Sequence, residues 1–504
     1  MDSEASITAA VEAYQRGDLR AAHQLVEQQL AKSGHDPQLY HLMGLIECGA
    51  GRNDAGLGWL KRASKADPAN IGWLVAYARL LADLGWVNEA LAEIDAGSRL
   101  ALDRMLAADG PDRISPANLA QLRELGIVLE RSNHLDGLRQ LLSAAEDAGI
   151  TKESLGSLWA SIALREGEPE EAKRLLLQDR ALFDDAHWDR LMTKVADALG
   201  EYDEAFAAAT AMNRAAYGYE EWRRRSAHYR AQIRATAKIV TPEWASRIHH
   251  AAADDGLSDP AFVVGFPRSG TTLLDTFLMG HPDTCVIEEG RMLELATEVI
   301  SQSPGLDWPT AIVDRARKAY ADELSRHVPQ GFAGLVVDKH PMNMLRLAVL
   351  HALFPKAKVI FAQRHPCDVV LSGFMQSFQL NHAMANFLDL GDAADLYDAS
   401  MTMWTRSREP IPQATHTVIY ERLVADPVSQ LRPAVEFLGL DWSDDLLDHQ
   451  TTARGRGLIT TASFDQVVQP LSSAPSGRWR RYRNHLESVL PVLLPWAEKL
   501  GYVD

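Results

Sequence analysis

The chain has 504 residues, an ordinary mixture of charged and apolar residues, and a formal net charge of −17. Its length allows two or more domains, each with a core of its own. An acidic balance without a basic stripe argues against nucleic-acid binding. Three cysteines far apart in the sequence, Cys48, Cys285 and Cys367, form neither a disulfide framework nor a metal-binding motif.

The sequence carries no sign of a membrane segment. It has no apolar run of about 18 residues or more, so no membrane span is expected. The first residues, 1–5, lack the basic start and apolar core of a secretory signal. We therefore expect a cytoplasmic protein.

The N-terminal half repeats with a period close to 34 residues. The anchor positions of this lattice are Gly17, Gly51, Gly85, Asn133, Gly167 and Gly200. Five residues after each anchor stand Ala22, Gly56, Ala90, Leu138, Ala172 and Ala205. All but one of these residues are small, as close helix packing requires. The pattern resembles the tetratricopeptide repeat, which stacks helix pairs into a superhelix with a concave binding face.

This resemblance implies an all-α superhelix over residues 1–215 that binds a peptide or protein. Residues 103–118 interrupt the lattice with turn-forming Gly and Pro, which predicts a loop insertion. An irregular helical domain with chance spacing is the alternative. Residues 216–257 are expected to connect the array to the next domain, chiefly through a helix over 217–238. Five arginines on that helix predict a solvated face or the entrance to an anionic site: Arg223, Arg224, Arg225, Arg230 and Arg234.

Residues 261–274 contain the most informative pattern in the chain. An apolar, β-branched run over 262–264 predicts a buried parallel strand, and a helix is expected from Thr271 onward. Between them lies a short loop bounded by Gly265 and Gly270. A strand, a glycine-bounded loop and a helix N-terminus form a phosphate cradle, because unpaired N–H groups and the helix dipole attract an anion.

The spacing of Gly265 and Gly270 matches the nucleotide-binding P-loop, with one departure. Thr271 replaces the lysine that reaches the β- and γ-phosphates in that motif. This replacement argues against hydrolysis of a metal-bound triphosphate. It favours an anion that is held by hydroxyl groups and by Arg268.

Further strands are expected over residues 284–287, 335–337, 358–362 and 416–420, which completes a parallel sheet. Helices are expected over residues 291–301, 309–326 and 485–500. Polar residues follow the strands at the edge where ligands of open α/β sheets bind. They are Glu288, Glu289, Lys339, Arg364 and, eight residues later, Ser372. The two carboxylates are candidates for a general base, although they could also favour the next helix through its dipole. Arg364 with Ser372 is a candidate for binding a second phosphate.

These motifs resemble those of sulfotransferases that use 3′-phosphoadenosine 5′-phosphosulfate (PAPS). Residues 267–273 match the family's 5′-phosphosulfate loop, and residues 288–291 resemble its Glu-Glu-Thr-Arg motif. Residues 338–341 are similar to its Asn-Lys-Asp-Pro motif, and residues 463–470 to the loop that covers the nucleotide. The sequence is most similar to the tyrosylprotein sulfotransferases within this superfamily. The whole chain resembles the bacterial type that joins tetratricopeptide repeats to such a domain.

The resemblance implies a P-loop-like α/β sulfotransferase domain with a parallel central sheet over residues 258–504. Glu289 is then the expected catalytic base, and Lys339, Arg268 and Ser463 are expected at the transferring group. Arg291 is expected to bind the substrate. The expected nucleotide-binding residues are Pro267, Arg268, Ser269, Gly270, Thr271, Thr272, Arg364, Ser372, Tyr420, Ser463, Asp465, Gln466 and Arg478.

The chain departs from the family pattern at a few positions. Leu295 stands where the family has an arginine that grips acidic substrate residues, and Cys367 replaces another basic residue. No counterpart of the family's membrane anchor is expected here. These departures concern the acceptor rather than the chemistry.

The expected reaction moves a sulfuryl group from PAPS to a hydroxyl, and releases adenosine 3′,5′-bisphosphate (PAP) without a metal. The expected acceptor is a tyrosine of a peptide or protein held partly by the repeat groove; a carbohydrate, lipid or small phenol is the alternative. A homodimer is also compatible with the sequence. Two other classes compete: a P-loop kinase or NTPase, with Asp338 as the nearest magnesium ligand, and a non-catalytic nucleotide-binding scaffold. The filled catalytic positions argue against the scaffold.

Overall fold

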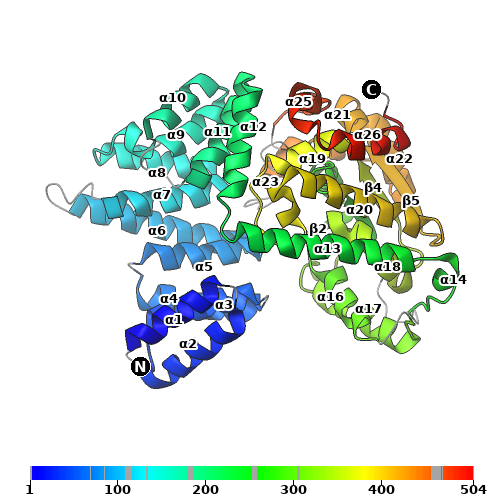
Figure 1. Cartoon of the computed structure of the whole chain (residues 1–504), viewed down its shortest axis with the longest axis horizontal. Coiled ribbons are helices and arrows are strands. Elements are labelled where there is room, and N and C mark those ends of the chain that lie inside the picture. Colours follow the sequence, from blue (N-terminus) through cyan, green and yellow to red (C-terminus); the bar gives the residue numbers. More distant parts are fainter. Residues whose placement is uncertain are drawn as a thin grey trace. The chain divides into compact units, whose positions relative to one another are not determined.

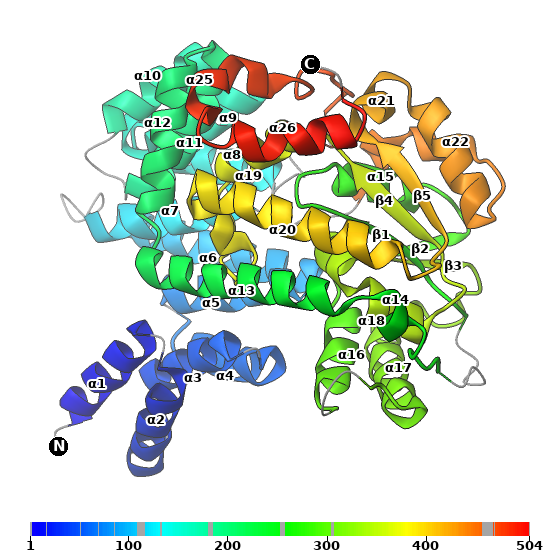
Figure 2. The same cartoon turned by 45° about the vertical axis from the view of Figure 1, so that its right-hand side comes forward.

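The computed structural model describes residues 3–16, 18–50, 52–68, 70–84, 86–107, 116–131, 134–179, 185–251, 258–303, 307–455, 467 and 469–502. The chain divides near residue 184 into two compact units. The N-terminal unit comprises residues 1–183, and the C-terminal unit comprises residues 184–455 and 461–504. Figures 1 and 2 show the elements of both units, coloured along the chain. The domain boundaries expected after residues 215 and 257 stay predictions.

The described residues of the N-terminal unit are mostly helical. In chain order these are α1 (Ser3–Gln15), α2 (Leu19–Ser33), α3 (Pro37–Gly49), α4 (Asn53–Ala66), α5 (Ile71–Asp83), α6 (Val87–Ala107), α7 (Pro116–Arg131), α8 (Leu135–Asp147), η2 (Lys152–Leu155), α9 (Gly156–Glu166) and α10 (Pro169–Asp179). Neighbours pack in pairs, α1 with α2, α3 with α4, α5 with α6 and α9 with α10. The expected tetratricopeptide-like helical half is thus confirmed.

The repeat positions predicted to be small are packing positions. The side chains at Ala22, Ala90, Leu138 and Ala172 are fully buried. At Gly56, an added Cβ would lie 2.4 Å from Cys48 Sγ, so no larger residue fits there. The loop insertion expected over 103–118 is wrong at both ends, because α6 continues to Ala107 and α7 begins at Pro116. The intervening residues, 108–115, lie outside the described residues.

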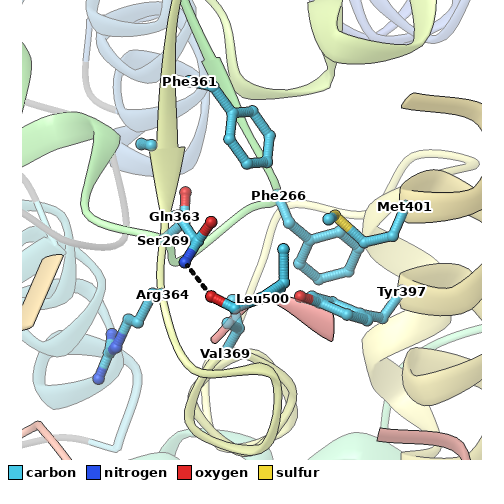
Figure 3. A pocket seen from close by; sticks show the side chains of 10 residues that line it. Phe266, Ser269, Phe361, Gln363, Arg364, Val369, Tyr397, Met401 and Leu500 are labelled. Carbon is cyan, nitrogen blue, oxygen red and sulfur yellow. Dashed lines mark hydrogen bonds between the residues drawn. The ribbon is translucent and has the colours of Figure 1, made fainter. Parts of the chain in front are cut away.

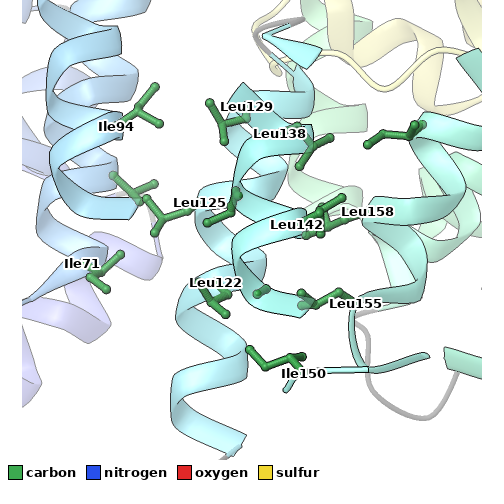
Figure 4. Close-up of a cluster of buried hydrophobic side chains, with 14 of the residues drawn as sticks. Ile71, Ile94, Leu122, Leu125, Leu129, Leu138, Leu142, Ile150, Leu155 and Leu158 are labelled. Atoms are coloured by element: carbon green, nitrogen blue, oxygen red, sulfur yellow. The ribbon is translucent and has the colours of Figure 1, made fainter. Parts of the chain in front are cut away.

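A continuous apolar core runs through the middle of the N-terminal unit, as Figure 4 shows. Leu125 of α7 lies between side chains from the helices before and after it. Ile71 and Ile94 come from α5 and α6, and Leu142 and Leu158 come from α8 and α9. Each of these side chains is buried, which stabilises the array by about 1.5–3 kcal/mol per residue. Burial between successive helices is what a repeat array needs, because one helix pair alone cannot hide its apolar face.

A parallel five-stranded sheet forms the centre of the C-terminal unit. Its strands are β1 (Ala261–Gly265), β2 (Thr284–Glu288), β3 (Leu335–Lys339), β4 (Val359–Gln363) and β5 (Thr415–Ile419). Their order is β2-β3-β1-β4-β5, so β1 lies in the middle and is buried along its whole length. All five predicted strands, and the predicted parallel sheet, are confirmed. Because the strands are parallel, the residues after them gather at one edge.

Helices precede the sheet and alternate with its strands. They are α11 (Asp185–Leu199), α12 (Tyr202–Arg214), α13 (Tyr219–Ile239), α14 (Pro242–Ala245), α15 (Thr271–Met279), α16 (Met292–Ser301), α17 (Thr310–Leu324), η4 (Pro341–Arg346), α18 (Leu347–Leu353), α19 (Pro366–Phe374), η5 (Met384–Leu388), α20 (Leu390–Arg408), α21 (Tyr420–Ala425), α22 (Pro427–Leu438), η6 (Asp444–Leu447), α23 (His449–Gly455), η7 (Arg478–Tyr482), α25 (Arg483–Leu486) and α26 (Leu490–Lys499). No helix among the described residues combines the length and apolar composition needed to cross a membrane.

Two expectations about helices need correction. The single helix predicted over 485–500 is two helices, α25 and α26, because Pro491 cannot donate the hydrogen bond that a continuous helix requires. The arginine row of α13 is only partly a solvated face and does not line the candidate cavity described below. Arg230 donates to Asp392 at 2.8 Å and to Asp395 at 2.7 Å, and it is almost fully buried. These ion pairs tie α13 to α20, and Figure 2 shows the two helices side by side.

Candidate active site

A tight glycine turn joins β1 to the cradle helix α15. Gly270 has φ +93°, a left-handed conformation that glycine adopts without strain. A Cβ at this position would lie 2.5 Å from Tyr420 Cδ2. The turn therefore requires glycine for its backbone and for its space. The neighbouring side chains at Pro267, Ser269, Thr271 and Thr272 are all buried in the cradle.

Among the described residues, two that are not glycine also have a left-handed backbone. They are Arg268, with φ 72°, and Glu289, with φ 52°. This conformation costs a residue with a Cβ about 1–2 kcal/mol, and such strain concentrates at functional sites. Glu289 is held in place by its backbone N–H, which donates to the carbonyl of Lys339 at 2.7 Å. Both strained residues are ones that the sequence motifs had marked as catalytic.

The cradle arginine and the predicted second-phosphate pair lie together. The Nε of Arg268 donates to the Ser372 hydroxyl at 3.1 Å, and Arg364 Nη1 donates to the carbonyl of Arg268 at 3.0 Å. The Arg364 guanidinium also lies over the Tyr420 ring, 4.4 Å from its centroid. Arg268, Ser372 and Arg364 are each buried. Four predicted nucleotide-binding residues from different elements therefore form one cluster.

A cavity of about 220 Å³ opens beside this cluster. Its lining residues are Arg268, Gly270, Leu273, Arg364, Tyr420, Val424, Val467, Gln469, Pro470, Leu471, Ser472, Ala474 and Pro475. Two arginines and no acidic residue are among them, so the described lining favours an anion. The Nε of Arg364 is buried and has no hydrogen-bond partner among the described residues. A donor without a partner beside two cations fits a phosphorylated nucleotide at this position.

The other side of the cradle loop is closed by packing (Figure 3). Phe266, Tyr397 and Met401 surround a space of about 10 Å³, which is too small for a ligand. There the Nε2 of Gln363 donates to the carbonyl of Leu500 at 3.1 Å. The loop is thus supported from behind, and its open side faces the larger cavity.

Lys339 lies at the end of β3 among three carboxylates. Its Nζ is 2.8 Å from Glu288 Oε1, 3.1 Å from Glu289 Oε1 and 3.2 Å from Asp275 Oδ2. Lys339 and Asp275 are fully buried, whereas the side chain of Glu289 is 46% exposed. The candidate base is therefore the carboxylate of this group most accessible to an acceptor.

The carboxylates keep Lys339 charged despite its burial. Burial alone favours the neutral amine, but Glu289, Asp275 and Glu288 outweigh it and raise the pKa of Lys339 above its ordinary value. Among the described residues, no group of three or more His, Cys, Asp and Glu side chains is placed to hold a metal ion. In this cluster the ammonium group of Lys339 occupies the position between the carboxylates.

The carboxylate next to Lys339 in sequence has a different environment. Asp338 is fully buried, and its Oδ2 accepts a hydrogen bond from the Tyr320 hydroxyl at 3.0 Å. Burial raises the pKa of Asp338 to about 7, although the Tyr320 hydrogen bond opposes the shift. Asp338 supports the strand end from inside the core and does not line the cavity.

The remaining predicted site residues lie away from the cavity lining or outside the described residues. Arg291, which directly precedes α16, pairs with Glu294 and Glu298 of that helix at 3.2 and 3.5 Å. Arg478 pairs with Asp197 of α11 at 2.9 Å. Neither arginine is among the cavity-lining residues. Ser463, Asp465 and Gln466 lie outside the described residues.

Asp275, the buried counter-ion of Lys339, was not expected from the sequence. The sequence does contain a hint of this role, because Asp275 is the one charged residue within the apolar run of α15. Amphipathic spacing alone could not show what a buried carboxylate in that run would face. Its partner comes from β3, which lies more than 60 residues later in the chain.

Comparison with known proteins identifies the domain that holds this site. Residues 260–444 match the model of the Sulfotransferase family. The C-terminal unit carries a sulfotransferase domain. The matched residues include the glycine turn, Glu289, Lys339, Arg364 and Tyr420. The recognised combination of a tetratricopeptide-like half with a sulfotransferase domain is confirmed.

Individual relatives of the sulfotransferase domain are distant. An uncharacterized protein of Aquifex aeolicus is 26% identical over 437 residues, which are 80% of this chain and 54% of that protein. The chain thus spans about half the length of that relative. Protein-tyrosine sulfotransferase 1 of Danio rerio is 28% identical over 258 residues, which are 48% of this chain and 71% of that protein. A solved sulfotransferase domain from the Synechococcus olefin synthase is 22% identical, with a TM-score of 0.35 over 51% of this chain and 99% of that one.

Proposed function

We propose that this sulfotransferase takes its sulfuryl group from PAPS and transfers it to a tyrosine hydroxyl of a peptide or protein. The cavity carries the first part of this proposal, because two buried arginines and the glycine turn line it and no acidic residue is among the described lining. A PAPS-like nucleotide has phosphates at both its 5′ and 3′ positions. The cradle loop suits the first phosphate. Arg364, whose Nε has no partner among the described residues, suits the second.

The residues at the strand ends would divide the chemistry between them. PAPS supplies the sulfuryl group, and PAP departs with its 5′-phosphate as the leaving group. Glu289 accepts the proton of the attacking hydroxyl, since its carboxylate is the exposed member of the cluster. Lys339 and Arg268 stabilise negative charge on the reacting oxygens.

The base and the lysine touch each other, which constrains this mechanism. Glu289 Oε1 accepts a hydrogen bond from Lys339 Nζ at 3.1 Å, so this oxygen must leave the lysine before it can take the proton of an acceptor. Asp275 and Glu288 keep two further contacts to Lys339, at 3.2 and 2.8 Å. They can therefore hold Lys339 when Glu289 turns toward an acceptor.

The tyrosine acceptor is supported by relatives rather than by geometry. Several relatives at 25–28% identity are named protein-tyrosine sulfotransferase. The tetratricopeptide-like helices add support, because such arrays bind extended peptides on a concave face. A carbohydrate, lipid or small phenol would use the same base and the same donor site.

A P-loop kinase or NTPase fits the structure less well. Asp338 was the nearest candidate for a magnesium ligand, and it is fully buried and bonded to Tyr320. Its pKa, raised to about 7 by burial, weakens it further as a ligand. Thr271 also occupies the position of the P-loop lysine.

The donor is tested by calorimetry on the full chain without metal. We expect PAP to bind at least about tenfold more tightly than ADP, a difference of about 1.4 kcal/mol. This preference should vanish in Arg364→Ala. Arg432→Ala is the matched control, since Arg432 stacks on Trp442 and does not line the cavity. Equal affinities for the two nucleotides, or a requirement for Mg²⁺, would exclude the proposed donor site.

The acceptor and the base are tested by sulfuryl transfer from PAPS. A peptide with one tyrosine should be modified, and the same peptide with phenylalanine should not. Glu289→Gln should lower kcat by about a hundredfold or more, while the Kd for PAP changes less than about threefold. Loss of PAP affinity as large as the loss of rate would refute the base assignment. Modification of sugars or phenols but not of the peptide would refute the tyrosine acceptor.

A further inference from the structure

The wall of the cavity runs directly into the turn η7. Residues 469–475 form much of the lining, and η7 begins three residues later. Arg364 holds the end of the wall, because its Nη2 donates to the carbonyl of Pro475 at 2.9 Å. The carboxylate of Asp368 in α19 then accepts from the backbone N–H groups of Gly477 and Trp479, at 2.7 and 2.8 Å. The position of the wall thus depends on how η7 is held.

A residue of α11 holds the side chains at both ends of η7. Asp197 Oδ1 accepts from Arg478 Nε at 3.1 Å and from the Tyr482 hydroxyl at 2.5 Å. Arg478 Nη2 lies 2.9 Å from the same oxygen. The side chains of Asp197 and Arg478 are only 28% and 19% exposed, so solvent screens this contact less than a surface ion pair.

The helix pair α11–α12 is itself fixed to the sulfotransferase domain. Phe206 of α12 stacks on Phe374 and on His485, with centroid distances of 5.1 and 4.4 Å. Asn213 Nδ2 donates to the carbonyl of Phe374 at 2.8 Å, and Asn213 is buried. These contacts attach α12 to the domain, and α12 packs against α11, which carries Asp197.

We propose that Asp197 is a positioning residue that sets the nucleotide affinity of the cavity by fixing η7 and the wall before it. Asp197 acts through Arg478 and Tyr482, because no residue of α11 or α12 is among the described cavity lining. The last helix pair of the predicted repeat region therefore contributes to donor binding without touching the donor. This inference rests on the proposed function, since it takes a PAPS-type nucleotide as the occupant.

The structure assigns Arg478 a role that differs from the one implied by the family motif. A direct nucleotide contact would leave Arg478 competing between the ligand and Asp197. Removal of the Asp197 carboxylate would then leave the affinity for the nucleotide unchanged or increase it. If Arg478 instead links η7 to α11, removal of the Asp197 carboxylate lowers the affinity for the nucleotide. The two roles predict opposite signs for one substitution.

The experiment compares PAP binding to the full chain and its Asp197→Asn variant by calorimetry. We expect about a fivefold or larger loss of affinity, equivalent to about 1 kcal/mol. In transfer assays the KM for PAPS should rise by a similar factor, with kcat changed less than about twofold. Asp203→Asn is the control, because Asp203 lies on the same helix pair, pairs with His485 at 2.8 Å and is almost fully exposed. It should bind PAP as the wild type does.

A second variant guards against a simple folding defect. Tyr482→Phe removes one hydrogen bond to Asp197 and keeps the ring that packs against Tyr202 at 5.1 Å. It should fold normally and lose about twofold to threefold in PAP affinity. Wild-type protein that binds PAP, together with unchanged affinity in both variants, would overturn the role of Asp197. Failure of the wild type to bind PAP would instead refute the proposed function.

Discussion

Lys339 shows how far single residues could be assigned from their motif. Its place at the end of a buried strand was predictable, because an apolar run precedes it directly. The identity of its partners was not, since Asp275 and Glu288 come from other elements. The left-handed backbone of Arg268 and Glu289 could not be predicted from the sequence either, because neither residue type favours it. Local sequence indicated the chemical groups, and tertiary contacts fixed their geometry.

Asp338 should give the protein a measurable pH dependence. Burial raises its pKa to about 7, so the folded state binds more protons than the unfolded state between about pH 4 and pH 7. Stability from this group is therefore present at low pH and falls as pH rises through that window. In Asp338→Asn this dependence should disappear, and the amide oxygen can still accept the Tyr320 hydrogen bond.

The measurement is urea unfolding of both proteins between about pH 4.5 and pH 8. The stability of Asp338→Asn relative to wild type should rise with pH by on the order of a few kcal/mol. His340, whose pKa burial lowers to about 4, has the opposite effect but is present in both proteins. A stability difference that stays constant over this pH range would contradict the prediction.

At the scale of elements, α13 and α20 carry complementary charges that the sequence shows only in part. Acidic residues recur every third position of α20, and arginines recur along one side of α13. Arg223 pairs with Asp392 at 2.9 Å, and Arg234 pairs with Asp398 at 3.1 Å. Such rows of charge are compatible with two paired helices or with two solvated faces. About 150 residues separate the helices, so no local pattern shows whether they are neighbours. Only the packing of α13 on α20 decides between these outcomes.

Across the whole molecule, the repeat pattern and the division into compact units assign α11 and α12 differently. The repeat lattice continues through Gly200 and Ala205, which places these helices in the array by sequence. Their contacts place them in the C-terminal unit, which begins near residue 184. Ala205 is fully buried, as the repeat pattern predicts. A small residue indicates that a helix packs closely against a neighbour. It does not indicate which neighbour that is.

Two fragments test which boundary governs folding. Residues 185–504 should fold, and should bind PAP within about twofold of the full chain. Residues 216–504 lack Asp197, Phe206 and Asn213, and should lose at least about 5 °C in Tm together with PAP affinity. Thermal unfolding and calorimetry measure both effects. Equal stability of the two fragments would show that α11 and α12 are dispensable.

Patterns among neighbouring residues were enough to predict the order of elements, the parallel sheet and the glycine turn. Alternating apolar strands, helical periodicity and the φ requirement of Gly270 are local properties, so they can be read from neighbouring residues. The same patterns also placed Glu289, Lys339 and Arg364 at the ends of strands that share one edge.

Which groups meet in and around the site follows only from the packing of the folded chain. Asp275 faces Lys339, Arg268 meets Ser372, and Asp197 holds η7. Each of these contacts joins residues that lie more than 50 positions apart. Their distances depend on how helices and strands pack in three dimensions, and no local pattern encodes that arrangement.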